Sequence, residues 1–224
     1  MEADGSALTP RGAATRSRIV DAAADLMYAA GVAGTSLDAV MAASGTSKSQ
    51  LYHYFADKDD LVAAVIALQT ERVLQSQEPQ LHHLDSMPGL RAWADAVVAS
   101  QARQECVGGC PVGSLAAELA DSPRARTLLA ASFEQWESFL VAGFTAMQER
   151  GELVPDVDPH DLATSVMAAL QGGLLLADIT RTTRPLRLAL DLALERIASL
   201  HRPPRSGPSR RAAAATSART PRRS

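Results

Sequence analysis

Apolar residues recur every three or four positions along most of this chain, which is the spacing of one face of an α-helix. Glycine, proline and small polar residues interrupt this spacing at intervals, and β-branched runs bounded by turns are missing. The pattern therefore predicts an all-α protein. The expected helices span about residues 15–31, 37–44, 47–55, 58–74, 90–106, 114–120, 123–150, 159–180 and 185–200.

Residues 35–55 predict two short helices joined by a tight turn. Gly45 stands between them and can adopt the positive φ that often ends a helix. The apolar positions expected to face inward are Leu37, Val40, Met41, Leu51 and Phe55. The candidate N-caps, which can accept hydrogen bonds from free backbone N–H groups, are Thr35, Ser36, Thr46 and Ser47. This arrangement is typical of a helix-turn-helix.

The second of these helices and the residues after it read S-K-S-Q-L-Y-H-Y-F, then A-D-K-D-D-L. This stretch closely resembles the recognition helix and next helix start of the tetracycline-repressor (TetR) family, and the resemblance extends over about residues 17–65. It implies an N-terminal three-helix DNA-binding domain and a C-terminal helical domain for ligand binding and dimerisation. Ser49 departs from the glycine often found at its position, so the family's sequence preference is not transferable.

We expect the DNA-binding domain at residues 15–60 and the ligand-binding and dimerisation domain at 61–200. Residues 1–14 and 201–224 are rich in small, polar or basic residues and are expected to be disordered. Net charge is −3, and residues 1–60 hold five Lys and Arg against eight Asp and Glu. DNA binding would therefore need local placement of Arg16, Arg18, Lys48 and Lys58 on one side. The seven arginines of the tail would add non-specific attraction to DNA.

The second helix carries side chains suited to base edges and phosphates. Gln50 can bond bidentately to adenine, and a helix N-terminus attracts phosphate. By the resemblance, Tyr52, His53 and Lys58 match positions that contact phosphate. The residues predicted to contact DNA are Thr35, Ser36, Thr46, Ser47, Lys48, Gln50, Tyr52, His53 and Lys58. An ordinary solvated helix face is the alternative for Lys48 and Gln50.

The C-terminal region predicts an effector pocket and a dimer interface. Its aromatic stripe is typical of core, but the family's ligand cavity is lined by core-facing residues, so both interpretations can hold. The candidate pocket residues are Trp93, Phe133, Trp136 and Met167. By the resemblance, the last two long helices pair with their copies, and the candidate interface residues are Leu170, Gly173, Leu174, Leu190 and Leu194. An excess of acidic residues in this region favours a neutral or cationic effector.

Other chemistry is sparse. Cys106 and Cys110 fall short of a structural zinc site, and we interpret them as small buried residues rather than a redox or metal sensor. No glycine-rich phosphate loop, H-E-x-x-H or G-x-S-x-G pattern is found, so we expect no enzyme, metal or cofactor. We read no apolar stretch of the ~20 residues that cross a bilayer and no export signal. A cytoplasmic protein without membrane contact is therefore expected.

The leading interpretation is a homodimeric transcription repressor that a small hydrophobic or amphipathic effector releases from a palindromic double-stranded DNA operator. One alternative is a helix-turn-helix DNA binder without a small-molecule effector. Another is an all-helical protein-interaction or small-molecule-carrier module. The long helical region beyond residue 60 favours the first over the second, because dimerisation alone would need less chain.

Overall fold

The computed structural model describes residues 8–201 of the 224-residue chain. Its elements, in chain order, are α1 (Pro10–Gly34), α2 (Leu37–Ser44), α3 (Lys48–Tyr54), α4 (Lys58–Gln75), the 3-10 helix η1 (Gln80–His83), α5 (Met87–Arg103), α6 (Pro111–Glu118), α7 (Pro123–Glu149), α8 (Pro159–Thr180) and α9 (Arg184–Ser199). Within residues 8–201, strand-like pairing is limited to one isolated bridge, so the predicted all-α fold is confirmed. The predicted basic tail lies, apart from residue 201, outside the described residues.

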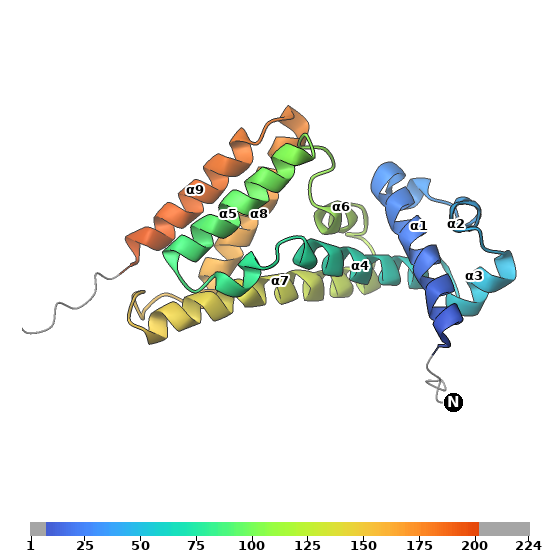
Figure 1. Ribbon diagram of the computed structural model, residues 1–224, viewed down its shortest axis with the longest axis horizontal. Helices are drawn as coiled ribbons and strands as arrows, with labels where there is room; N and C mark the ends of the chain where they lie inside the picture. Colours follow the sequence, from blue (N-terminus) through green and yellow to red (C-terminus); the bar gives the residue numbers. More distant parts are fainter. Residues whose placement is uncertain (1–7, 202–224) are drawn as a thin grey trace, which may run out of the picture.

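Helices α1, α2 and α3 form a small unit at one end of the molecule (Figure 1). Helix α4 leaves this unit and runs beside α7 toward the other end, where α5, α8 and α9 lie together. The short helix α6 sits between α1 and this bundle and also contacts α4 and α7. The N-terminal unit therefore meets the C-terminal helices through α4 and α6.

Local side-chain caps fix the helix-turn-helix. The Ser36 hydroxyl accepts a hydrogen bond from the Ala39 N–H (3.1 Å) at the start of α2. Gly45 ends α2 with φ of 64°, a backbone conformation that suits glycine. At the start of α3, Ser47 and Gln50 form a reciprocal capping box in which each side chain accepts from the other residue's backbone N–H.

Helix α1 starts earlier than the sequence reading placed it. The Thr9 hydroxyl accepts from the Gly12 N–H (3.2 Å), and Pro10 occupies the first helical position, where its missing N–H is not needed. The prediction that residues 10–14 are disordered is therefore wrong. Near its other end α1 kinks at Gly31, which has φ of 75°.

Helix α8 is long and apolar enough to cross a bilayer by length and composition, with a mean hydropathy of 1.5, although we expected no such stretch. In the fold it packs against α7 and α9, and 44% of its most apolar window is buried. A Cβ at Gly173 would lie 2.8 Å from the Leu186 Cα, so glycine lets α8 and α9 approach closely. Packing within the bundle thus accounts for part of this hydropathy.

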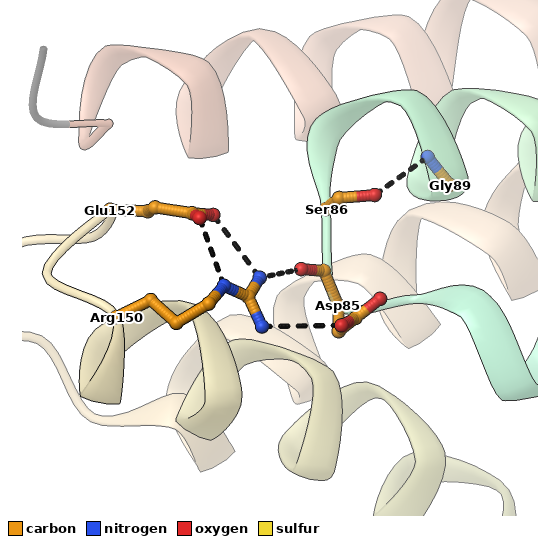
Figure 2. A network of polar contacts seen from close by, with 5 residues as sticks. All are labelled: Asp85, Ser86, Gly89, Arg150 and Glu152. Atoms are coloured by element: carbon orange, nitrogen blue, oxygen red, sulfur yellow. Dashed lines mark hydrogen bonds and ion pairs between the residues drawn. The ribbon is translucent and has the colours of Figure 1, made fainter. Parts of the chain in front are cut away.

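The far end of the C-terminal domain is held by Arg150, which follows α7 (Figure 2). Its guanidinium donates to the carboxylate of Glu152 (2.9 Å) and to both the backbone carbonyl and the carboxylate of Asp85. Next to Asp85, the Ser86 hydroxyl caps α5 by accepting from the Gly89 N–H (3.2 Å). This network ties the end of α7 to the start of α5.

Candidate DNA-binding surface and ligand cavity

Helix α3 turns one face to the core and the other to solvent. Leu51 and Phe55 are 0% and 2% exposed and hold the helix against the rest of the N-terminal unit. The predicted DNA-contacting residues that are exposed are Ser36, Ser47, Lys48, Gln50, Tyr52 and His53. The Lys48 ammonium lies 5.9 Å from the centre of the Tyr52 ring, one helical turn away, so the two side chains share one outward face.

Three other predicted DNA contacts lie elsewhere. Thr35 and Thr46 are buried, and their hydroxyls bond to the Gly31 carbonyl (2.8 Å) and the Ser44 hydroxyl (2.7 Å), so neither is presented to DNA. Lys58 is half-buried, and its ammonium donates to the Val32 carbonyl at the end of α1 (2.6 Å). These side chains shape the unit from within, which the motif match alone did not reveal.

Three of the eight acidic residues in the N-terminal region pair with arginines of α4 and α7. Asp21 and Asp25 of α1 lie 2.7 Å and 3.6 Å from the Arg72 guanidinium. Asp60 pairs with Arg124 of α7 (2.7 Å), and the hydrogen bond from Arg124 lowers the pKa of Asp60 below its ordinary value. These three carboxylates therefore meet arginines away from α3, which weakens the charge argument against DNA binding.

A cavity of about 210 Å³ lies among the helices that follow the N-terminal unit, and Tyr28 of α1 also lines it. Helices α1, α4, α5, α6, α7 and α8 all contribute to its wall. The lining residues are Tyr28, Gln69, Arg72, Val73, Ser76, Gln77, Trp93, Ala96, Val97, Ser100, Gln101, Gln104, Gly109, Cys110, Pro111, Trp136, Leu170 and Leu174. Its wall is mixed: aromatic and aliphatic groups alternate with uncharged amides and hydroxyls, as in many small-molecule sites.

Two of the four predicted pocket residues, Trp93 and Trp136, line this cavity. Phe133 and Met167 do not: Phe133 is half-buried against the core, and Met167 is 3% exposed within it. The predicted aromatic stripe of α7 is therefore divided between core and cavity. Gln69 and Gln101, two polar residues of the wall, were not predicted, although each interrupts an apolar helical stripe.

The five predicted dimer residues face into the protomer. Leu170 and Leu174 line the cavity, Gly173 packs on α9, and the other two, Leu190 and Leu194, are 0% and 5% exposed. Their assignment to the dimer interface is therefore wrong. The exposed apolar residues of α8 and α9 are instead Leu175, Leu176, Ile179, Leu188 and Leu192.

Cys106 and Cys110 are both free and buried, as predicted. The Cys110 thiol caps α6 by accepting from the Gly113 N–H (3.4 Å), and burial raises its pKa above the ordinary value. A thiol with a raised pKa is a poor nucleophile, which argues against a redox sensor. Within residues 8–201, no group of three or more His, Cys, Asp or Glu side chains could hold a metal ion.

Helix α1 reaches the C-terminal domain at two further points. The Tyr28 hydroxyl, on the cavity wall, lies 3.5 Å from the Val107 carbonyl in the loop between α5 and α6. The Glu118 carboxylate at the end of α6 accepts from the Val32 N–H (2.7 Å), just after the kink of α1. Tyr28 of α1 thus belongs both to the DNA-binding unit and to the cavity wall. Helix α6 contributes to the wall and also contacts α1.

Two regions of the chain match models of one protein family. Residues 19–65 match the family model described as bacterial regulatory proteins, tetR family, and residues 86–193 match the model of the tetracyclin repressor-like C-terminal domain. The chain belongs to the TetR family. It is a helix-turn-helix transcriptional regulator whose C-terminal helices form the second domain characteristic of TetR proteins.

TetR relatives match along nearly their whole length. An HTH-type transcriptional regulator from Lactococcus lactis subsp. lactis is 29% identical over 187 residues, covering 80% of this chain and 90% of that protein. The HTH-type transcriptional repressor DhaR of Mycobacterium sp. (strain GP1) is 25% identical, with coverage of 80% and 90%. A TetR regulator structure from Chloroflexus aurantiacus superposes with a TM-score of 0.73 at 29% identity, covering 87% of this chain and 99% of that one.

Proposed function

We propose that this TetR protein is a homodimeric repressor that leaves its DNA operator when a small hydrophobic or amphipathic molecule fills the cavity. The observation that carries the proposal is the cavity wall itself, which includes Tyr28 of α1 and Arg72 of α4. A molecule bound there touches the helices that position the DNA-binding unit. A DNA binder without an effector would have no use for the cavity, and a protein-interaction or small-molecule-carrier module would have no use for the contact of its wall with the DNA-binding unit.

The coupling follows from thermodynamic linkage. An effector weakens DNA binding only if it prefers a conformation in which the recognition helices are wrongly placed. Arg72 lines the cavity and also holds Asp21 and Asp25 of α1, so a shift of α4 changes the position of α1. Displacement of α6 would act on α1 as well, through Glu118. We propose α4 and α6 together as the lever.

We further propose that two protomers meet through the outward faces of α8 and α9. Leu175, Leu176 and Ile179 follow one another at helical spacing and are 60%, 52% and 68% exposed. Gly172 lies on the same stripe with open space where a Cβ would be, which favours close approach of a second helix. A two-fold dimer would set two recognition helices roughly 34–36 Å apart, one DNA turn.

The proposal assigns binding rather than catalysis to the protein, in the cytoplasm and without a membrane. We propose Ser36, Ser47, Lys48, Gln50, Tyr52 and His53 as the DNA contacts, since they are exposed on the helix-turn-helix. Lys58 stays a candidate through the ammonium donors that Val32 does not use.

The test follows DNA binding and the cavity together. Both tryptophans of the chain line the cavity, so intrinsic fluorescence reports its occupancy. We would titrate small hydrophobic compounds against the protein bound to DNA from upstream of its own gene. The expected result is a compound that changes fluorescence and releases DNA over the same concentration range. Tight sequence-specific DNA binding that no cavity-binding compound alters would support the regulator without an effector.

Replacing Gln50 with alanine should reduce affinity for the preferred operator by about 1–3 kcal/mol and leave weak binding to random DNA nearly unchanged. The capping box complicates this variant, because the Gln50 Oε1 accepts from the Ser47 N–H (2.9 Å). Gln50→Glu keeps that acceptor but loses the amide donor, so it should show the same loss of preference. Lys48→Ala should weaken all sequences alike. An unchanged ranking of operator variants in both Gln50 substitutions would exclude Gln50 from base readout.

Replacing Gly108 with alanine should disturb the contact between the cavity loop and α1. Gly108 has φ of 89°, and a Cβ there would overlap the Tyr28 hydroxyl. Gly151 is the matched control, because it has φ of 72° and open space around a Cβ. Both substitutions put alanine in a left-handed backbone conformation, which should cost roughly 1–2 kcal/mol of folding stability. Only Gly108→Ala should also change operator affinity, by about tenfold. Equal operator affinity in the two variants would show that Tyr28 does not position α1.

A further inference from the structure

Two glutamines of the cavity wall, Gln69 and Gln101, make no side-chain hydrogen bond to the rest of residues 8–201. Gln69 of α4 and Gln101 of α5 are 6% and 9% exposed, and both line the cavity. Neither side-chain amide hydrogen-bonds another residue within the described part of the chain, residues 8–201. Because both residues line the cavity, a ligand there can reach these amides. These two groups therefore stand ready for a partner that enters the cavity.

A neighbouring glutamine in the same wall shows the contrast. Gln77 accepts from the Trp93 indole N–H (2.8 Å) and donates to the Val73 carbonyl (3.2 Å), so both ends of its amide are used. The indole N–H of Trp136, in contrast, is buried without a partner among residues 8–201. Trp136 also lines the cavity. In the cavity wall, unused hydrogen-bonding capacity is thus found in Gln69, Gln101 and Trp136; the amide nitrogen of Gln171, outside the wall, is also buried without a partner among residues 8–201.

The charge and size of the cavity limit what can use this capacity. Among its lining residues, Arg72 carries the formal charge, and Asp21 and Asp25 already oppose it. An anionic ligand would have to compete with these carboxylates, and a cationic ligand would find no free carboxylate in the wall. A dry cavity of roughly 150 Å³ holds benzene, so 210 Å³ suits a molecule of one or two rings.

We propose that the effector is an uncharged ring compound bearing a carbonyl or similar hydrogen-bonding group, and that Gln69 and Gln101 recognise that group. This inference rests on the proposed function, in which the cavity is the effector site. It adds the chemical class of the ligand and the two residues that select it. The apolar side of the ligand would lie against Trp93, Val97 and Leu170.

Four matched probes test the class: 1-indanone, indane, indane-1-carboxylate and 1-aminoindane. They share a bicyclic skeleton and differ in the carbonyl or the charge. Ligand-observed NMR titrations of the full-length protein should give a dissociation constant for 1-indanone about tenfold lower than for indane. Both charged probes should bind more weakly than 1-indanone. Binding of indane as tight as that of 1-indanone, or tightest binding of a charged probe, would overturn the proposed class while leaving the cavity as effector site.

Methionine variants test the two glutamines. Gln69→Met and Gln101→Met keep side-chain length and remove the amide, so each should weaken 1-indanone binding about five- to tenfold and leave indane binding unchanged. Neither should lower the unfolding midpoint, since no protein hydrogen bond is lost. Gln75→Met is the control, because Gln75 lies on α4 outside the cavity and bonds Glu71 (3.0 Å).

Other outcomes separate the two proposals. Lowered stability in the Gln69 and Gln101 variants, with 1-indanone affinity unchanged, would overturn the assignment of these residues to ligand recognition. If none of the four probes bound the protein or altered its DNA affinity, the class would be overturned, and the proposed function would then depend on the wider compound titration.

Discussion

Glutamate placed at both Leu176 and Leu192 should leave the protein monomeric at micromolar concentration and lower operator affinity by about a hundredfold or more. These side chains are 52% and 69% exposed and belong to α8 and α9, so the substitutions should leave each protomer folded. Two-fold symmetry puts each new carboxylate into the interface twice, where it would be buried among apolar groups without a partner. A monomer presents one recognition helix and loses the gain from binding two half-sites together.

Light scattering and operator titrations measure this result. The control is Ala130→Glu combined with Ala142→Glu, which adds the same charge at two exposed positions of α7. That variant should stay dimeric and keep most of its operator affinity. If the Leu176 and Leu192 variant remained a dimer, the interface would have to lie on a surface other than the outward faces of α8 and α9.

Some helix limits were predictable because their causes are local, whereas α5 and α6 start at Met87 and Pro111, three residues before the predicted positions. Ser36 and Ser47 were among the candidate N-caps predicted from the sequence, and each accepts a backbone N–H in the structure. The start of α1 was missed although Thr9 and Pro10 carry the same kind of signal. There, the small and polar composition of residues 1–14 outweighed the cap in our reading. Where a helix start signal and the composition of the segment disagree, the start signal is the better guide.

The proposed dimer face could not be predicted from the sequence, because α8 is apolar on more than one side. Leu170, Leu174 and Ala177 form one helical stripe that faces inward, and Leu175, Leu176 and Ile179 form another that faces solvent. Periodicity identifies a stripe but does not say which side of the protomer it covers. The choice depends on where α7 and α9 pack, which is a tertiary property.

The cavity was only half predictable for a related reason. Aromatic residues of α7 were read as a single face, yet Trp136 reaches the cavity whereas Phe133 does not. Three positions along a helix differ by about 60° in direction, enough to separate core from cavity wall. The glutamines at positions 69 and 101 carried a readable signal, since a polar residue in a buried stripe needs a partner. A polar residue in an apolar stripe can be recognised from the sequence, but the cavity beside it cannot.

Trp136→Ala should lower the free energy of unfolding by roughly 3–5 kcal/mol, because a large buried side chain is removed and the existing cavity grows. Trp136 is 3% exposed, and within residues 8–201 its indole N–H has no partner. The loss should therefore come from packing alone. Trp136 lies in the C-terminal domain, so the variant should keep its DNA affinity under conditions where the protein stays folded. It should lose the ligand response, because Trp136 lines the cavity.

Two variants, Trp93→Phe and Trp136→Phe, separate the cost of lost packing from the cost of a lost hydrogen bond. Trp93 is 0% exposed, and its indole N–H donates to the Gln77 amide (2.8 Å), so Trp93→Phe removes ring volume and also leaves a buried acceptor unpaired. Trp136→Phe removes ring volume alone. We expect Trp93→Phe to cost roughly 1–3 kcal/mol more than Trp136→Phe in denaturant unfolding, measured at one protomer concentration because dimer stability depends on it. Equal costs would mean that the Trp136 N–H is hydrogen-bonded in solution, and Trp136 would then offer the ligand no free donor.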